Sequence, residues 1–294
     1  ITLGGTFDVT GARDDGDSDA GGNATAAGSF LLGSGSEIKT EGGSTARAGG
    51  DVTIKTAVRT ASLNAPTDGD LEIEGNITTE GGTATSAGLD GGAVNLTAGV
   101  EGSTAGTITI SSDVVINTKG SAAASSSAGN GGDGGAVTLN THAETIVLTD
   151  TSIDSSGGAK DGGGTAGAGG TITISDNLSI VDGDSSGVIL TTGSTAGNVV
   201  LSGTVDGSTT LSLTSGTGTI SLGGVVGGST GPTGLTISGA GVTLSNNISA
   251  AGNVEISAPV TLGDSFTIDT NIDGTDGNIT FNSSSTIDGN NTLT

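Results

Sequence analysis

The chain has 294 residues, of which 58 are Gly and only four are aromatic, and it contains no Cys, Met, Trp or Tyr. Its 31 acidic residues outnumber seven basic ones, which gives a formal net charge of −24. A surface this acidic repels nucleic-acid phosphates and anionic lipids, so the composition excludes nucleic acid and membrane insertion. A wide globular core usually relies on aromatic side chains. Their scarcity favours a thin stack of coils over a sphere.

Intrinsic disorder is the first alternative to a folded stack. Ile, Val, Leu and Phe account for 64 residues, just above the level of about 20% below which a highly charged chain is expected to be disordered. Two features favour a folded chain. The apolar residues follow a pattern, and most are β-branched, whereas disordered chains are poor in such residues and rich in Pro, Lys and Glu.

A repeated motif dominates residues 37–185. A short alternating segment ends at Gly-Gly, a loop of small residues follows, and a second Gly-Gly opens the next alternating segment. The first copy starts at Ile38 and runs through Gly42-Gly43 and Gly49-Gly50 to Ile54. Further copies start at Ile77, Ile116 and Ile153. Repetition at about 39 residues is typical of stacked solenoids, and stacked repeats would place their loops in a ragged ridge along one side.

Residues 186–294 have shorter turns and a shorter period. Apolar residues fall six apart at Val242, Ile248, Val254, Val260, Phe266 and Ile272. Three six-residue sides give an 18-residue coil, which would stack Val242 on Val260, Ile248 on Phe266 and Val254 on Ile272. The 39-residue repeat would then be two coils, giving about 15 coils in a rod on the order of 70 Å long.

The sequence therefore predicts an all-β fold, a right-handed parallel β-helix with essentially no α-helix. Residues 1–185 would form coils with long Gly-rich loops, and residues 186–294 would form regular coils with short turns. Together they would make one continuous solenoid.

The repeat resembles that of filamentous-haemagglutinin-like large exoproteins, the bacterial β-helix adhesins. The resemblance rests on the Gly-Gly motif above and on the segments 218–228 and 235–244. It implies a right-handed β-helix, export to the cell surface or the medium, and a role as an adhesin or extracellular filament. The secretion domain found at the N-terminus of that family has no recognisable counterpart in this sequence.

The sequence offers few candidates for chemistry. Asp15, Asp17 and Asp19 alternate in a way that suits calcium, although the segment lacks the Gly and Glu of an EF-hand loop, and a solvated acidic loop is the alternative. Residues 129–135 faintly resemble one calcium-binding nonapeptide. His142 is the only His, and no nucleophile motif accompanies it, so we expect an ordinary surface residue and no enzyme. Calcium is therefore the one candidate cofactor.

Outward-facing Thr pairs occur at Thr107 and Thr109 and at Thr171 and Thr173. Flat Thr arrays on some β-solenoids bind ice, but these pairs do not recur in successive coils. The simpler interpretation is that Thr favours strands.

The two ends of the chain alternate like strands. The chain starts Ile1-Thr2-Leu3 and ends Thr292-Leu293-Thr294. Because an uncapped coil exposes an unpaired edge, we expect these residues to form a polymerisation interface that joins copies head to tail. The sequence thus predicts a structural subunit of an extracellular bacterial fibre. The alternative is a non-enzymatic adhesin stalk that binds a glycan or a surface protein through its loops.

Overall fold

The computed structural model describes residues 7–11, 29–43, 46–56, 69–99, 106–125, 128–142, 144–272, 274, 276–282 and 285–294. Within these residues every regular element is a short β-strand, and none is a helix. Neighbouring strands of successive coils pair in parallel and in register. The predicted all-β parallel β-helix is confirmed.

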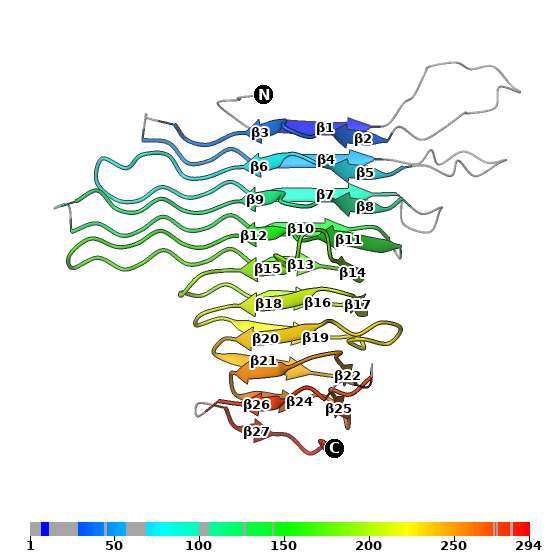
Figure 1. The fold of residues 1–294 in the computed structure, drawn as a ribbon. Coiled ribbons are helices and arrows are strands. Elements are labelled where there is room, and N and C mark those ends of the chain that lie inside the picture. The colour runs from blue at the N-terminus through cyan, green and yellow to red at the C-terminus, as the bar shows by residue number, and fades with distance from the viewer. Residues whose placement is uncertain are drawn as a thin grey trace, which may run out of the picture.

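Three sheets run along the solenoid (Figure 1). Sheet A contains β3 (Glu37–Lys39), β6 (Asn76–Thr78), β9 (Val115–Asn117), β12 (Ser152–Asp154), β15 (Val188–Thr191), β18 (Thr210–Thr214), β20 (Gly234–Ser238), β23 (Val254–Ser257) and β26 (Ile279–Phe281). Sheet B contains β1 (Phe7–Gly11), β4 (Val52–Thr56), β7 (Val94–Ala98), β10 (Val137–Asn140), β13 (Ile172–Ile174), β16 (Val199–Leu201), β19 (Thr219–Leu222), β21 (Gly241–Leu244), β24 (Val260–Leu262) and β27 (Ile287–Asp288).

Sheet C is the shortest of the three. It contains β2 (Phe30–Leu32), β5 (Leu71–Ile73), β8 (Ile108–Ile110), β11 (Thr145–Thr149), β14 (Asn177–Val181) and β17 (Val205–Gly207). Single bridges at Val226 extend it to the pair β22 (Ile248–Ser249) and β25 (Ile268–Asp269). Each coil passes from sheet A to sheet B to sheet C and back to sheet A.

The core is a narrow prism filled by aliphatic side chains. Because side chains alternate along a strand, every second residue points inward and stacks on its equivalent in the next coil. In sheet A, Ile38 stacks on Ile77, which stacks on Ile116, and all three are fully buried. Among the buried core residues that the structure describes, only Phe266 is aromatic, and Phe30 is partly buried against the core. The composition therefore indicated the core correctly.

The 39-residue repeat is one coil, so the prediction that it is two coils is wrong. Val52 pairs directly with Val94, and Val94 pairs directly with Val137. The additional residues do not build strands; they leave the solenoid as loops. Sheet B has ten strands, so the rod is about 43 Å long instead of the predicted 70 Å.

The predicted 18-residue coil is found once. Val242 pairs with Val260 as expected. Ile248, however, pairs with Ile268 and not with Phe266, and Val254 pairs with Ile279 and not with Ile272. Turns of variable length between these strands shift the register, which a fixed six-residue period cannot anticipate.

Candidate functional site

A buried column of hydroxyl groups lies where six successive coils pass from sheet A to sheet B. Each hydroxyl donates a hydrogen bond to the carbonyl of the Gly at which the chain returns to sheet B. We call these residues the neck hydroxyls: Thr40, Thr79, Thr118, Ser155, Thr192 and Ser215. Their partners are Gly50, Gly92, Gly135, Gly170, Gly197 and Gly218.

The neck hydroxyls explain the motif that dominates the sequence. Thr118 Oγ1 lies 2.6 Å from the carbonyl oxygen of Gly135, and Ser155 Oγ lies 2.8 Å from that of Gly170. The backbone closes the same neck, because the amide of Gly135 donates to the carbonyl of Thr118. A loop of any length can therefore leave the solenoid between the hydroxyl and the Gly without disturbing the sheets.

The long loops between the necks form a layered extension that we call the flange, residues 81–92, 120–125, 128–135 and 157–170. In Figure 1 these loops project to the left of the sheets as stacked wavy segments. Outgoing and returning segments bind each other through their backbones. The amide of Gly158 donates to Gly132, that of Gly132 to Ser121, and that of Ser121 to Leu89, over 2.7, 3.0 and 2.8 Å.

Glycine makes this close backbone packing possible. A Cβ atom on Gly158 would overlap the carbonyl oxygen of Ser121, and one on Gly132 would overlap that of Leu89. The fully buried residues of the described part of the flange are all glycines: Gly82, Gly92, Gly132, Gly135, Gly158, Gly167 and Gly170. The stacking of the loops is confirmed, but the predicted ragged ridge is wrong, since the flange is regular and hydrogen-bonded.

Asp150 fixes the corner between sheets C and A. Its buried carboxylate accepts hydrogen bonds from the amides of Gly183, Asp184, Ser185 and Gly187 and from the Thr209 hydroxyl. Burial acts to raise the pKa of this carboxyl, but the amide bonds outweigh it and hold the pKa well below its usual range. One carboxylate thus joins three successive coils.

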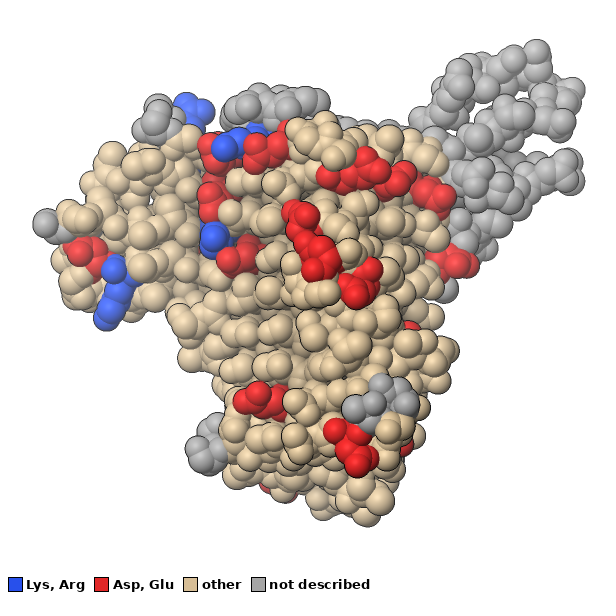
Figure 2. Space-filling view, viewed as in Figure 1, with Lys and Arg blue, Asp and Glu red and all other residues tan. Residues whose placement is uncertain are grey.

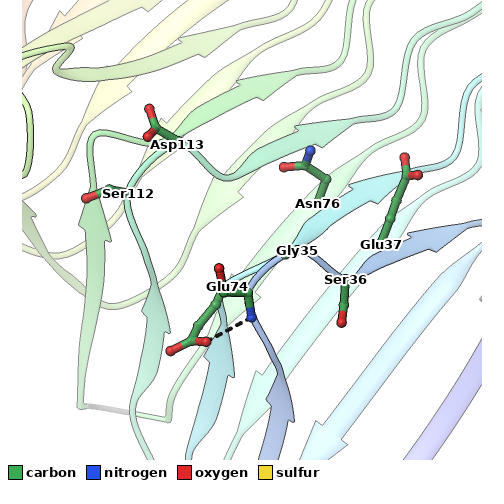
Figure 3. A pocket seen from close by; sticks show the side chains of 9 residues that line it. Gly35, Ser36, Glu37, Glu74, Asn76, Ser112 and Asp113 are labelled. Carbon is green, nitrogen blue, oxygen red and sulfur yellow. Dashed lines mark hydrogen bonds between the residues drawn. The ribbon is translucent and has the colours of Figure 1, made fainter.

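A shallow hollow of about 440 Å³ lies on the same corner, nearer the N-terminal end (Figure 3). Its polar side chains mostly bind neighbouring coils. Glu74 accepts from the amide of Ser34 over 3.0 Å, and Asn76 accepts from that of Val115 over 2.8 Å. Glu37 accepts from the Thr78 hydroxyl. These contacts give the hollow a structural role in joining coils.

The C-terminal end of the solenoid exposes core positions. Ile279 occupies the inner column of sheet A below Val254 yet is 43% exposed. Ile287 occupies that of sheet B below Val260 and is 45% exposed. Among the strands that the structure describes, β26 and β27 each pair on one side only. With Phe281 and Leu293, both partly buried against the core, they form what we call the end face.

The predicted polymerisation residues fall partly on this end face. Leu293 bridges Phe266, and the amide of Thr294 donates to the carbonyl of Phe266 over 3.1 Å. Thr292 accepts from the amide of Phe266. Residues 292–294 therefore form the lower edge of the solenoid on the side of sheet C. Ile1, Thr2 and Leu3 lie outside the described residues, so the matching half of the predicted interface stays a prediction.

The predicted calcium ligands Asp15, Asp17 and Asp19 also lie outside the described residues. Among the residues that the structure describes, no three acidic or His side chains are grouped so that they could hold a metal ion. His142 lies in a turn at φ 54°, where its amide binds the Asn140 side chain. Residues 129–135 form part of the flange, and Gly131 and Gly132 provide its close backbone packing.

Charged residues concentrate in the N-terminal part of the sequence. All seven basic residues and 24 of the 31 acidic residues lie in residues 1–185. Figure 2 shows acidic side chains gathered over the upper part of the molecule, with a few basic ones beside them. Lys119 pairs with Asp154 at 3.3 Å and Lys39 with Glu41 at 3.1 Å, all partly exposed. Such pairs contribute little stability.

Comparisons with known proteins yield no relative. Neither a protein-family model, nor a curated protein, nor a solved structure matches the chain. The resemblance to filamentous-haemagglutinin-like exoproteins therefore rests on the Gly-Gly motif and on segments 218–228 and 235–244 alone. The described residues include no helix long and apolar enough to span a membrane.

Proposed function

We propose that the chain is a non-enzymatic structural subunit of an extracellular bacterial fibre, in which copies stack end to end through the open ends of the solenoid. The observation that carries the proposal is the end face. Two Ile side chains at core positions are nearly half exposed there, above unpaired strand edges. Exposed edges of this kind pair readily with another chain.

The N-terminal strands would supply the matching surface. Within the described residues, β1, β2 and β3 lie at the opposite ends of the three sheets, and each pairs on one side only. A second copy stacked below the end face would add strands to all three sheets in the parallel sense that they already have. Because its two sides differ, such an interface does not close on itself and generates a filament.

The end face can be tested with a charge at its centre. We expect Ile287→Lys to shorten fibres strongly, because the added ammonium group would be buried without a partner. Ile189→Lys is the matched control, since Ile189 is 42% exposed on the outer surface of sheet A, away from both ends. Fibre length is measured by electron microscopy, and average mass by sedimentation velocity. Equal lengths for the two variants would refute the role of the end face.

The flange favours a second candidate, an adhesin stalk that binds a glycan or a surface protein. It holds exposed side chains such as Thr83, Thr85 and Thr165 on a regular hydrogen-bonded frame, and binding residues are often carried on such frames. Replacing the connection between Ser155 and Gly170 by the short one found between Ser215 and Gly218 would remove one layer. Loss of adhesion with unchanged fibres would support the adhesin.

A further inference from the structure

The outer surface of sheet B is free of charge over seven consecutive strands, from β7 to β24. The outward residues at its centre align in one column across the coils, as the strand registers show. In six of these coils the column is formed by Thr138, Thr173, Val200, Ser221, Thr243 and Thr261. The column does not repeat the two Thr pairs noted in the sequence, since Thr109 lies in β8 of sheet C and Thr173 in β13 of sheet B.

The other two sheets do not share this property. Sheet A presents Glu37, Lys39, Asp154 and Glu255 on its outer surface. Sheet C presents Glu72 on β5. Two copies of a chain with a net charge of −24 repel each other in most orientations. The charge-free surface of sheet B is the side on which two rods approach at the lowest electrostatic cost.

From this we infer that fibres of this protein pair laterally, with sheet B of one rod against sheet B of a second copy. Small side chains on flat strands of equal spacing can interdigitate between two sheets. The same surface on both copies gives a self-complementary, two-fold interface. This inference rests on the proposed function, because end-to-end stacking supplies the long rods.

The area of the surface explains why fibre length matters. Seven strands about 4.8 Å apart and about 12 Å long cover roughly 400 Å² on each copy. A total of about 800 Å² is below the range of specific interfaces. Single subunits should therefore pair weakly, and rods of many subunits should pair firmly because all contacts form together.

The experiment places one carboxylate on each of two surfaces. Thr243→Asp puts it on sheet B, and Thr236→Asp puts it on the adjacent strand β20 of sheet A. Both Thr residues are exposed and point outward, and both changes add the same charge. The readouts are fibre width and mass per length by electron microscopy, and subunit dimerisation by sedimentation at about 0.01 M and 1 M salt.

We expect wild-type and Thr236→Asp fibres to be two rods wide, and Thr243→Asp fibres to be one rod wide at unchanged length. Opposed carboxylates should weaken pairing at least about tenfold, and high salt should strengthen wild-type pairing by screening the net charge. Wild-type fibres that are one rod wide would overturn the inference of lateral pairing and leave end-to-end stacking intact. If the subunits form dimers but no fibres, and only Thr243→Asp abolishes the dimers, the lateral inference would hold and end-to-end stacking would be contradicted. Equal effects of both variants, or ice binding by sheet B without pairing, would also overturn it.

Discussion

The N-terminal and C-terminal coils differ in how far the chain leaves the solenoid between sheets A and B. In the N-terminal coils 10 to 17 residues separate a neck hydroxyl from its Gly partner, and in the C-terminal coils the separation is three to five. The same hydrogen bond closes both kinds of connection. The solenoid therefore accommodates loops of different lengths. The N-terminal and C-terminal coils share the same core, and the flange is added to the N-terminal coils.

The two regions also pack in different ways. The core buries aliphatic side chains such as Ile116, whereas the flange buries only glycine in its described part. Burial of apolar side chains stabilises the core. The flange depends on backbone hydrogen bonds and close contact, because it has no side chains to bury. Mutations that remove side chains should damage the core, and mutations that add them should damage the flange.

The largest effect is expected for Ile116→Ala, because it creates a cavity at a fully buried position in β9. Such a change typically costs about 4 kcal/mol. The neighbouring Val115→Ala, on the outer surface of the same strand, should cost under about 0.5 kcal/mol. Denaturant unfolding of both variants measures the difference. Similar losses for the two variants would show that the predicted inward and outward positions are wrong.

Asp150→Ala should come next, at about 3 kcal/mol, because it leaves several buried amides without an acceptor. The matched control is Asp182→Ala, since the Asp182 carboxylate is exposed and accepts from the Ser185 amide. Thermal and denaturant unfolding should show a loss under about 1 kcal/mol for the control. A small loss for Asp150→Ala would mean that the three coils do not depend on this carboxylate.

The same carboxylate predicts a dependence on pH. Its pKa is lower in the folded chain than in the unfolded chain. The stabilisation is therefore complete above the unfolded-state pKa of about 3.9 and is lost as the pH falls below it. Unfolding of wild type and Asp150→Asn between pH 7 and pH 2 should show a steeper acid loss for wild type. Parallel curves would contradict this account.

Gly158→Ala should act locally, at about 2 kcal/mol, because the added Cβ collides with the backbone at Ser121. Hydrogen exchange should show faster opening of the flange amides and unchanged protection in sheets A, B and C. Gly163→Ala is the control, since no atom lies within 4 Å of its added Cβ. Loss of protection throughout the sheets would mean that the flange and the core unfold as one unit.

The smallest effect, about 1.5 kcal/mol, is expected for Thr118→Val, which keeps the shape of the side chain but leaves the Gly135 carbonyl without its buried donor. Thr138→Val, on the outer surface of β10, should be nearly neutral. The comparison uses chemical denaturation of both variants. A neutral Thr118→Val would show that backbone hydrogen bonds alone close the neck.

The sequence allowed the strands to be predicted because strict alternation leaves a local pattern, as in Val94-Asn95-Leu96 and Val137-Thr138-Leu139. The number of coils could not be derived in the same way. Loops that leave the solenoid are rich in Gly, Thr and Ala, and so are the strands and turns of a coil. Only the hydrogen bond between a neck hydroxyl and its Gly partner shows which segment is a loop. Asp150 gave no sequence signal, since the backbone amides that donate to its carboxylate lie about 35 residues away. The neck hydroxyls did recur, in the motif that contains Thr40 and Thr79.

The central claim is that the solenoid continues from one copy into the next. Fibre diffraction of aligned wild-type material tests it most directly, because strands stacked along the fibre axis give a reflection on that axis. The account predicts an axial reflection at about 4.7–4.9 Å that persists in fibres many times longer than one subunit. Monodisperse short rods at high concentration, or fibres in which this reflection lies perpendicular to the axis, would contradict it.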